Sequence, residues 1–435
     1  MGDADPCTDA TRSLWRHKDF MKLWTGETVS VLGTQVTLVA MPLVALKLLG
    51  ASTFQVGLLA SLERLPFLLV GLPAGAIVDR LRRRPVLIAS DLGRALALGS
   101  IPVAYWAHAL SMSQLYAVVF VTGVLTVFFD VAYQSYLPAL VTRIQLVEGN
   151  SKLQVSESGA EIVGPALAGL LYQLFRAGAI VADAVSYVWS AACVLLIRGQ
   201  EVTPISARDE SGERVPLRRQ IAEGVRYVAG HQYLRAIAAC TAIANLFSSM
   251  LLAVFFTYAV RKLHMSAGLI GLVFAIGSVG FLLGALAAQP LARRLGVGPT
   301  IVWSALLFGP PMLLIPLAPQ GAPVPMLAAA WFVASTASPV YNISQVSLRQ
   351  AICPHRLQGR MNATMRFMVW GTMPIGALLG GILGSTGALG LRPTLYVGAI
   401  GQLVSFVPVA LSPVRSIRGM PDPEVDPVAT PVPAR

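Results

Sequence analysis

The chain has 435 residues, of which 55% are hydrophobic and only 12% are charged. Soluble proteins carry about 25% charged residues, so a chain this apolar could not cover its core with a solvated surface. The formal charge of +12 does not indicate nucleic-acid binding, because the basic residues fall at the ends of apolar runs and form no continuous stripe. The composition excludes a soluble protein and predicts an all-α protein that crosses a membrane many times.

A membrane-spanning helix needs about 20 mainly apolar residues. The sequence predicts twelve such helices, and their ranges are 20–47, 55–78, 85–107, 113–140, 153–175, 178–197, 234–260, 267–290, 299–318, 323–347, 360–384 and 391–411. They group into two six-helix bundles, at residues 20–197 and 234–412.

Three polar segments flank or separate these bundles. Residues 1–19 are predicted to be an N-terminal tail without a signal peptide. The linker 198–233 ends in an amphipathic pattern, in which Leu217, Ile221, Val225 and Val228 recur at helical spacing, and this predicts a helix on the membrane surface. The Pro-rich residues 413–435 are predicted to be a disordered tail.

The distribution of basic residues predicts the orientation in the membrane. Twelve spans place both termini on one side. That side receives 25 of the 33 lysines and arginines, and the opposite side receives five. Basic loops stay in the cytoplasm, so both termini and the central linker are predicted to be cytoplasmic.

The two halves of the sequence repeat. The segment Gly164-Pro-Ala-Leu-Ala-Gly-Leu-Leu resembles Gly376-Ala-Leu-Leu-Gly-Gly-Ile-Leu, at an offset of 212 residues. Asn150 and Asn362 stand at the same offset. Two like halves in the membrane are typical of secondary transporters, in which the substrate binds between the repeats.

The segment Gly75-Ala-Ile-Val-Asp79-Arg80-Leu-Arg-Arg83-Arg84 resembles the loop between helices 2 and 3 of the major facilitator superfamily. The common pattern there is Gly-x-x-x-Asp-Arg-x-Gly-Arg-Arg, and Arg82 replaces the second glycine. This departure, together with Asp91-Leu-Gly-Arg94-Ala, resembles the branch that contains macrolide exporters and the enterobactin exporter. The resemblance implies a twelve-helix major facilitator fold.

The resemblance also implies a cytoplasmic gate. In the superfamily the residues that match Asp79, Arg83 and Asp130 form a charge cluster that closes when the cavity opens outward. Asp130 lies 17 residues into a helix that starts outside, at a depth of roughly 25 Å, which is near the inner face. The alternative is that these charges only fix topology.

Acidic residues within the spans are the candidates for proton coupling, because a charge in the bilayer costs about 2.5–3.5 kcal/mol. Glu157 and Glu161 are four residues apart on one helix face, so each disfavours ionisation of the other. Together with Glu27 in the first helix they are predicted to carry protons, and static pairing with Arg366 or with cytoplasmic arginines is the alternative. Asp91 and Arg94 are predicted to form a structural ion pair, and Asp183 is predicted to be structural.

The segment Gly164-Pro165-Ala-Leu-Ala-Gly169 resembles the helix 5 motif of antiporters in the superfamily. Proline bends the helix and small residues allow close approach of a neighbour. The resemblance implies a bend that favours exchange over uptake, and packing alone is the alternative. Ala168 replaces the first glycine of the usual pair.

The resemblance implies a substrate cavity lined by helices 1, 4, 7 and 10. Its candidate residues are Gln35, Gln134, Asn245, Phe256, Tyr341, Asn342 and Arg366. Apolar walls with few amides favour bulky amphipathic compounds over sugars, which need many hydrogen bonds.

The sequence therefore predicts a monomeric, proton-driven exporter of a hydrophobic or amphipathic small molecule in a bacterial cytoplasmic membrane, surrounded by lipid. The substrate would be a drug, an antibiotic such as a macrolide, or a siderophore. Import or symport on the same fold is the alternative, and a non-transporting membrane sensor or enzyme is a weaker one. No phosphate-binding glycine loop, metal-ligand spacing or cofactor motif is found in the sequence, so no enzyme activity, metal or cofactor is expected.

Overall fold

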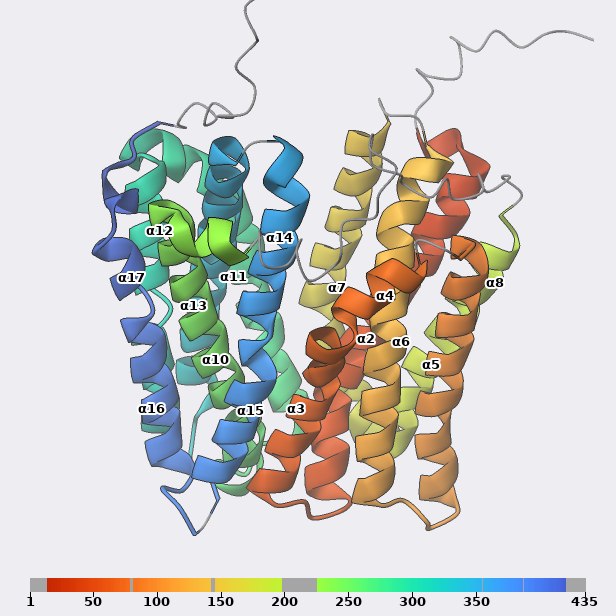
Figure 1. The fold of residues 1–435 in the computed structure, drawn as a ribbon. Helices are drawn as coiled ribbons and strands as arrows, with labels where there is room; N and C mark the ends of the chain where they lie inside the picture. The colour runs from red at the N-terminus through yellow and green to blue at the C-terminus, as the bar shows by residue number, and fades with distance from the viewer. Residues whose placement is uncertain are drawn as a thin grey trace, which may run out of the picture. The chain divides into compact units, whose positions relative to one another are not determined.

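The computed structural model describes residues 14–78, 81–141, 145–197, 225–353, 355–385 and 387–419. Within them the chain is helical and has no strands (Figure 1). Ten segments are long and apolar enough to cross a membrane. One of these, Val155–Leu195, has 41 residues, about twice the length that a bilayer requires.

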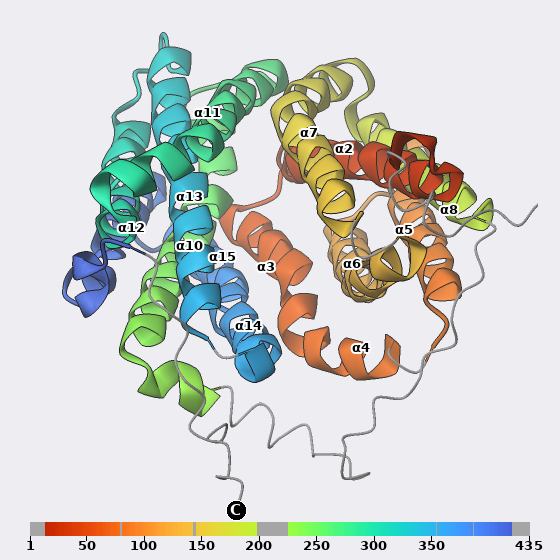
Figure 2. The ribbon, with the colours of Figure 1, turned by 90° about the horizontal axis from the view of Figure 1, so that it is seen from above.

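These ten segments give eleven spans, and a further span outside them brings the number in the described residues to twelve. Val155–Leu195 is two spans, because α7 (Leu146–Phe175) ends at Arg176, whose φ of 52° breaks the helix. The short helix η2 (Arg176–Ile180) and α8 (Val181–Leu195) follow it. The remaining span consists of α3 (Thr53–Leu69) and α4 (Gly71–Val78), which meet at a bend (Figure 2). Twelve predicted spans are thereby accounted for.

The first six spans begin with α2 (Lys18–Lys47) and also include α5 (Arg83–Trp106) and α6 (Met112–Leu140). The starts of α3 and α6 are capped by side chains that are close in sequence. Ser52 and Gln55 form a capping box at α3, and the Ser111 hydroxyl accepts a hydrogen bond from the Gln114 amide at the start of α6. A short helix, η1 (Leu14–Arg16), precedes α2.

Of the last six spans, three are single helices, namely α10 (Gln232–Arg261), α11 (Ala267–Leu295) and α13 (Val324–Ile352). Each of the other three is divided into two shorter helices. Proline stops α12 (Val297–Leu306) before η3 (Pro310–Leu317), and α14 (His355–Trp370) meets α15 (Thr372–Leu383) at Gly371. The final span comprises α16 (Leu391–Val404) and α17 (Val407–Ala410), followed by η4 (Pro413–Ser416).

The structure extends the sequence repeat to helix packing. Gly164 on α7 lies so close to α2 that an added Cβ would meet the side chain of Gln35. Gly376 on α15 lies equally close to α10, at the carbonyl oxygen of Leu246. The fifth helix of each half therefore contacts the first helix of that half through an equivalent glycine.

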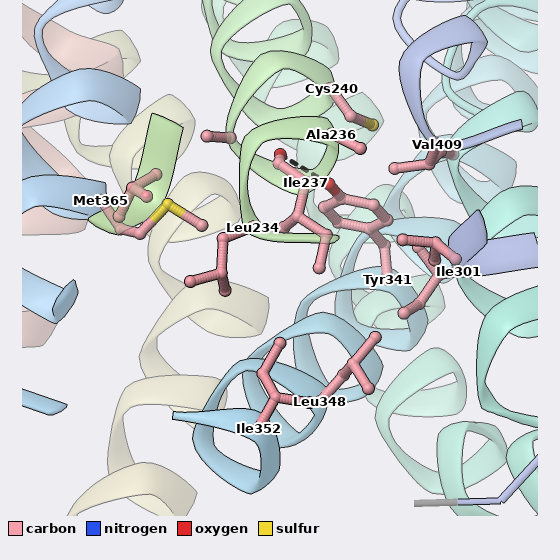
Figure 3. Close-up of a cluster of buried hydrophobic side chains, with 14 of the residues drawn as sticks. Leu234, Ala236, Ile237, Cys240, Ile301, Tyr341, Leu348, Ile352, Met365 and Val409 are labelled. Atoms are coloured by element: carbon pink, nitrogen blue, oxygen red, sulfur yellow. Dashed lines mark hydrogen bonds between the residues drawn. The ribbon is translucent and has the colours of Figure 1, made fainter. Parts of the chain in front are cut away.

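The chain forms two compact units. The first comprises residues 1–207 together with Ala253–Ile276, and the second comprises Arg208–Leu252 and Gly277–Arg435. The second unit has a buried core around Tyr341, whose hydroxyl faces the Ile237 carbonyl (Figure 3). Residues 225–230 are helical and bury Val228 in this core, whereas the rest of the predicted surface helix lies outside the described residues.

Candidate functional site

A buried ion pair occupies the first unit. Asp91 and Arg94 lie one turn apart on α5, are 0% and 4% exposed, and form a salt bridge. The Arg94 guanidinium also stacks on two aromatic rings, at 4.3 Å from the centroid of Phe129 and 4.1 Å from that of Tyr187. These contacts hold the cation between α5, α6 and α8, and they confirm the predicted pairing.

Three further carboxyl groups surround this pair. Glu27 on α2, Asp130 on α6 and Asp183 on α8 all lie within electrostatic range of Arg94. Asp183 is 1% exposed and accepts a hydrogen bond from the Ser186 hydroxyl at 3.2 Å. The Glu27 Oε2 atom is buried and has no hydrogen-bond partner among the described residues. Four helices thus supply one cation and four carboxyls, which we call the Arg94 cluster.

The sequence did not reveal this cluster. The sequence predicts that Arg94 pairs with Asp91 one turn away and that Asp183 is structural, but no local spacing connects these residues with Glu27 or Asp130. The only available signal was that both are ionisable residues within spans, where each needs a partner.

Two more carboxyl groups, those of Glu157 and Glu161 on α7, follow on from Glu27 of the Arg94 cluster. We call Glu27, Glu157 and Glu161 the line of carboxyls. Glu157 is exposed and interacts electrostatically with both Glu27 and Glu161, and Glu161 is half-buried. Helices α2 and α7 are held together beside them, where the Thr28 hydroxyl donates to Ser156 at 2.9 Å. The three proton-coupling candidates therefore lie near one another, and the line begins at the Arg94 cluster.

The loop 2–3 motif is only partly described. Asp79 and Arg80 lie outside the described residues, and Gly75 is in α4. Arg84 donates to the carbonyls of Val194 (3.2 Å) and Leu195 (2.6 Å), in the last turn of α8. Arg83 is half-buried at the start of α5, and Asp130 is half-buried on α6. The gate role of this motif stays a prediction.

The helix 5 motif is a close-packing surface within the first unit. An added Cβ on Gly169 would lie 2.7 Å from the carbonyl oxygen of Ala267, at the start of α11. One turn further along α11, a Cβ on Gly271 would meet the carbonyl oxygen of Pro165. Gln173 adds a hydrogen bond to the Ser266 hydroxyl at 3.3 Å. The predicted close approach is thus made to α11, and the antiporter role of the motif stays a prediction.

This contact yields a first prediction. Gly271→Ala should lower export, because a methyl group against the backbone of Pro165 forces α7 and α11 apart. Overpacking costs about 1–3 kcal/mol, which shifts a conformational equilibrium roughly 5–150-fold. Gly159→Ala on α7 is the matched control, since nothing lies within 4 Å of its added Cβ. Export per molecule of inserted protein is the measurement, and equal export by both variants would contradict the packing role.

Two of the predicted substrate-cavity residues lie in buried cores. Phe256 is 5% exposed and packs on Phe274, with ring centroids 5.7 Å apart. Tyr341 is 3% exposed, and its hydroxyl lies 2.7 Å from that of Thr241. In this structure both side chains contact neighbouring helices, and their contact with substrate stays a prediction.

The other candidates are distributed over both units. In the first unit, Gln35 is half-buried against Gly164, and Gln134 is exposed on α6.

The other three candidates lie in the second unit. Asn342 is exposed and accepts a hydrogen bond from Gln345 at 2.9 Å, and Arg366 is exposed, with its guanidinium 5.2 Å from the ring centroid of Trp370. The remaining candidate, Asn245, donates to the Val369 carbonyl at 3.2 Å and lines a cavity.

That cavity lies within the second unit and has a volume of about 230 Å³. Helices α10, α13 and α16 and the α12–η3 segment enclose it. Its polar and aromatic lining residues are Asn245, Ser248, Phe308, Trp331, Ser335, Ser338 and Gln402. Phe308 and Gln402 come from the ninth and twelfth spans, which the sequence did not implicate in substrate binding.

The fold and the line of carboxyls define a class: a multi-pass membrane protein with transporter architecture. A solved structure with the same fold is that of a bacterial homologue of the iron transporter ferroportin in an inward-facing state. It superposes with a TM-score of 0.70 at 17% identity and covers 92% of this chain and 99% of that one. At this identity the likeness shows the fold alone.

The chain belongs to the transmembrane secretion effector family, whose sequence profile matches residues 10–428, and thus to the major facilitator superfamily. The multidrug efflux pump Tap of Mycolicibacterium fortuitum is 28% identical over 383 residues, which are 86% of this chain and 90% of that protein. Macrolide efflux protein A of Streptococcus pyogenes is 28% identical over 185 residues, 42% of this chain and 45% of its own length. The predicted superfamily and its macrolide-exporter branch are confirmed.

Proposed function

We propose that this protein exports amphipathic drugs, macrolides among them, in exchange for protons. The observation that carries the proposal is the similarity over 86% of the chain to a protein named as a multidrug efflux pump. Export of drugs is favoured over export of siderophores because both relatives described above are named for drug or macrolide efflux.

The proton route that we propose runs along Glu27, Glu157 and Glu161. The Arg94 cluster places four carboxyls, that of Glu27 among them, within electrostatic range of one guanidinium. An acid in such a place binds and releases protons as its surroundings change. Proton binding at these carboxyls and substrate binding then exclude each other, which couples export to inward proton flow.

The energy suffices for export. One proton that crosses a potential of ~100 mV supplies about 2.3 kcal/mol. Since 1.4 kcal/mol corresponds to a tenfold ratio, an exchange of one proton for one neutral drug sustains a gradient of about 50-fold. A pH difference in the same direction would increase that gradient.

The setting that we propose is a bacterial cytoplasmic membrane, with both termini and the central linker in the cytoplasm. The 25 to five distribution of basic residues supports this orientation. We further propose that the protein works as a monomer, without an enzymatic step, nucleic acid or bound cofactor, because the proton gradient supplies the energy.

The test is accumulation of labelled erythromycin in energised cells that lack their own exporters. Cells that express the protein should hold less label than cells with an empty vector, and a protonophore should remove the difference. Import on the same fold would give the opposite result, namely more label in the expressing cells, and would contradict the proposal.

A substitution in the predicted gate tests the mechanism of export more specifically. Asp79→Asn is expected to abolish export without loss of membrane insertion, because it removes the negative charge that the superfamily uses to close the cytoplasmic side. Arg82→Gly is the control, since it restores the residue most common in the superfamily at that place. Export and membrane-inserted protein are both measured. Normal export by the Asp79 variant would exclude the gate.

A further inference from the structure

The cavity in the second unit has a lining without charge. We infer that it is a subsite for an uncharged aromatic group of those exported molecules that carry one, an inference that rests on the proposed function. None of the residues that line it is ionisable. A charged group would lose its hydration there and gain no countercharge, which is costly in a membrane protein.

The size of the cavity indicates how much of a ligand it holds. Sites for whole drug-sized ligands have volumes of about 300–1,000 Å³. A partly open cavity of about 230 Å³ therefore accepts one ring and leaves the rest of the molecule outside it. Trp331 and Phe308 supply aromatic faces, against which a ring stacks or packs edge to face.

Two of the hydroxyl groups that line the cavity lie on α13. Trp331, Ser335 and Ser338 recur at helical spacing on α13, and all three line the cavity. The neighbouring Thr336 donates to the Phe332 carbonyl of its own helix at 2.8 Å. The side-chain hydroxyls of Ser335 and Ser338 make no hydrogen bond to any residue that the structure describes. They are thus placed to donate to a carbonyl, hydroxyl or nitro group on the ring.

Gln402, which is 6% exposed on α16, also lines the cavity. With its amide oriented to satisfy both ends, it donates to the Phe308 carbonyl at 2.9 Å and accepts from the Ser248 amide at 3.2 Å. Gly401 beside it lies against the ring of Phe247 on α10. Gln402 is therefore a positioning residue, and hydroxyl donors remain on α13, at Ser335 and Ser338, and on α10, at Ser248.

The test uses chloramphenicol, an uncharged nitrophenyl compound with hydroxyl and amide groups, and purified protein in lipid nanodiscs. The double variant Ser335→Ala/Ser338→Ala should raise the Kd about tenfold, the loss expected for two hydrogen bonds. Ala334→Phe, which fills the cavity, should raise it at least as much. Thr336→Ala is the matched control and should leave the Kd within twofold.

A second measurement uses Trp331 directly. The nitrophenyl ring should quench the fluorescence of the wild-type protein, and Trp331→Phe should remove most of that quenching. The permanent cation ethidium should bind equally to the wild type and to the serine variant. The subsite is overturned if chloramphenicol does not bind at millimolar concentration, if the serine and Ala334 variants keep the wild-type Kd, or if ethidium binding falls in parallel.

The result separates this inference from the proposed function. If the variants lose chloramphenicol binding but wild-type cells do not export erythromycin, the subsite stands and the export function fails. If erythromycin is exported but no variant changes the Kd for chloramphenicol, the function stands and the subsite fails.

Discussion

Replacing Glu27 and Glu161 together by glutamine is expected to abolish the proton release that follows substrate binding. Glutamine keeps the shape of each side chain but cannot ionise. The Glu27 carboxyl has a buried oxygen without a hydrogen-bond partner among the described residues and interacts electrostatically with Arg94, whereas Glu161 interacts with Glu157. The steady-state drug gradient should then fall from about 50-fold to none, because the proton no longer contributes its energy.

The measurement is the pH change when erythromycin is added to purified protein in weakly buffered solution. Glu63→Gln is the control, because Glu63 is 35% exposed on α3 and lies 3.8 Å from Arg64. Substrate affinity should stay within about twofold in both variants, which shows that they fold. Unchanged proton release by the Glu27/Glu161 variant would exclude these carboxyls as the coupling groups.

Arg94→Met is expected to destabilise the first unit strongly. It leaves Asp91, which is 0% exposed, without its cation, and it removes the stacking on Phe129 and Tyr187. Removal of one partner from a buried ion pair costs about 3–5 kcal/mol, since the other charge is left uncompensated. The apparent Tm in detergent should therefore drop by several degrees or more.

Two companion variants make this prediction specific. Arg64→Met removes a cation that is 44% exposed and should hardly change the Tm. The double variant Asp91→Leu/Arg94→Met removes both buried charges and should recover much of the lost stability. If Arg94→Met is no less stable than Arg64→Met, the Arg94 cluster does not stabilise the bundle.

The sequence predicted the twelve spans because membrane helices are governed by length and apolarity, which are local properties. It did not predict that the second span would divide at Val70, between α3 and α4, or that Gly371 would divide the eleventh. Proline and glycine inside apolar runs were visible, but whether they interrupt a helix depends on packing by neighbouring helices. The repeat was visible as Gly164 and Gly376, and its meaning as equivalent helix contacts required the structure.

The site was less accessible to prediction. The carboxyls Glu27, Glu157 and Glu161 could be proposed from the sequence because an acid within a span is costly wherever it points. The central role of Arg94 was missed because Phe129, Tyr187 and Asp183 approach it from other helices. The neutral cavity was missed for a similar reason, since Phe308 and Gln402 carry no local pattern that marks a binding residue.

The central claim is that inward proton flow drives export, and reconstitution tests it most directly. Proteoliposomes with an acidic lumen are mixed with labelled erythromycin, and vesicles with the Glu27→Gln/Glu161→Gln protein correct for passive trapping of this weak base. Drug–proton exchange predicts that wild-type vesicles accumulate label above that level, and that a protonophore abolishes the excess. Excess uptake only under the opposite gradient, or equal uptake by both proteins, would contradict it.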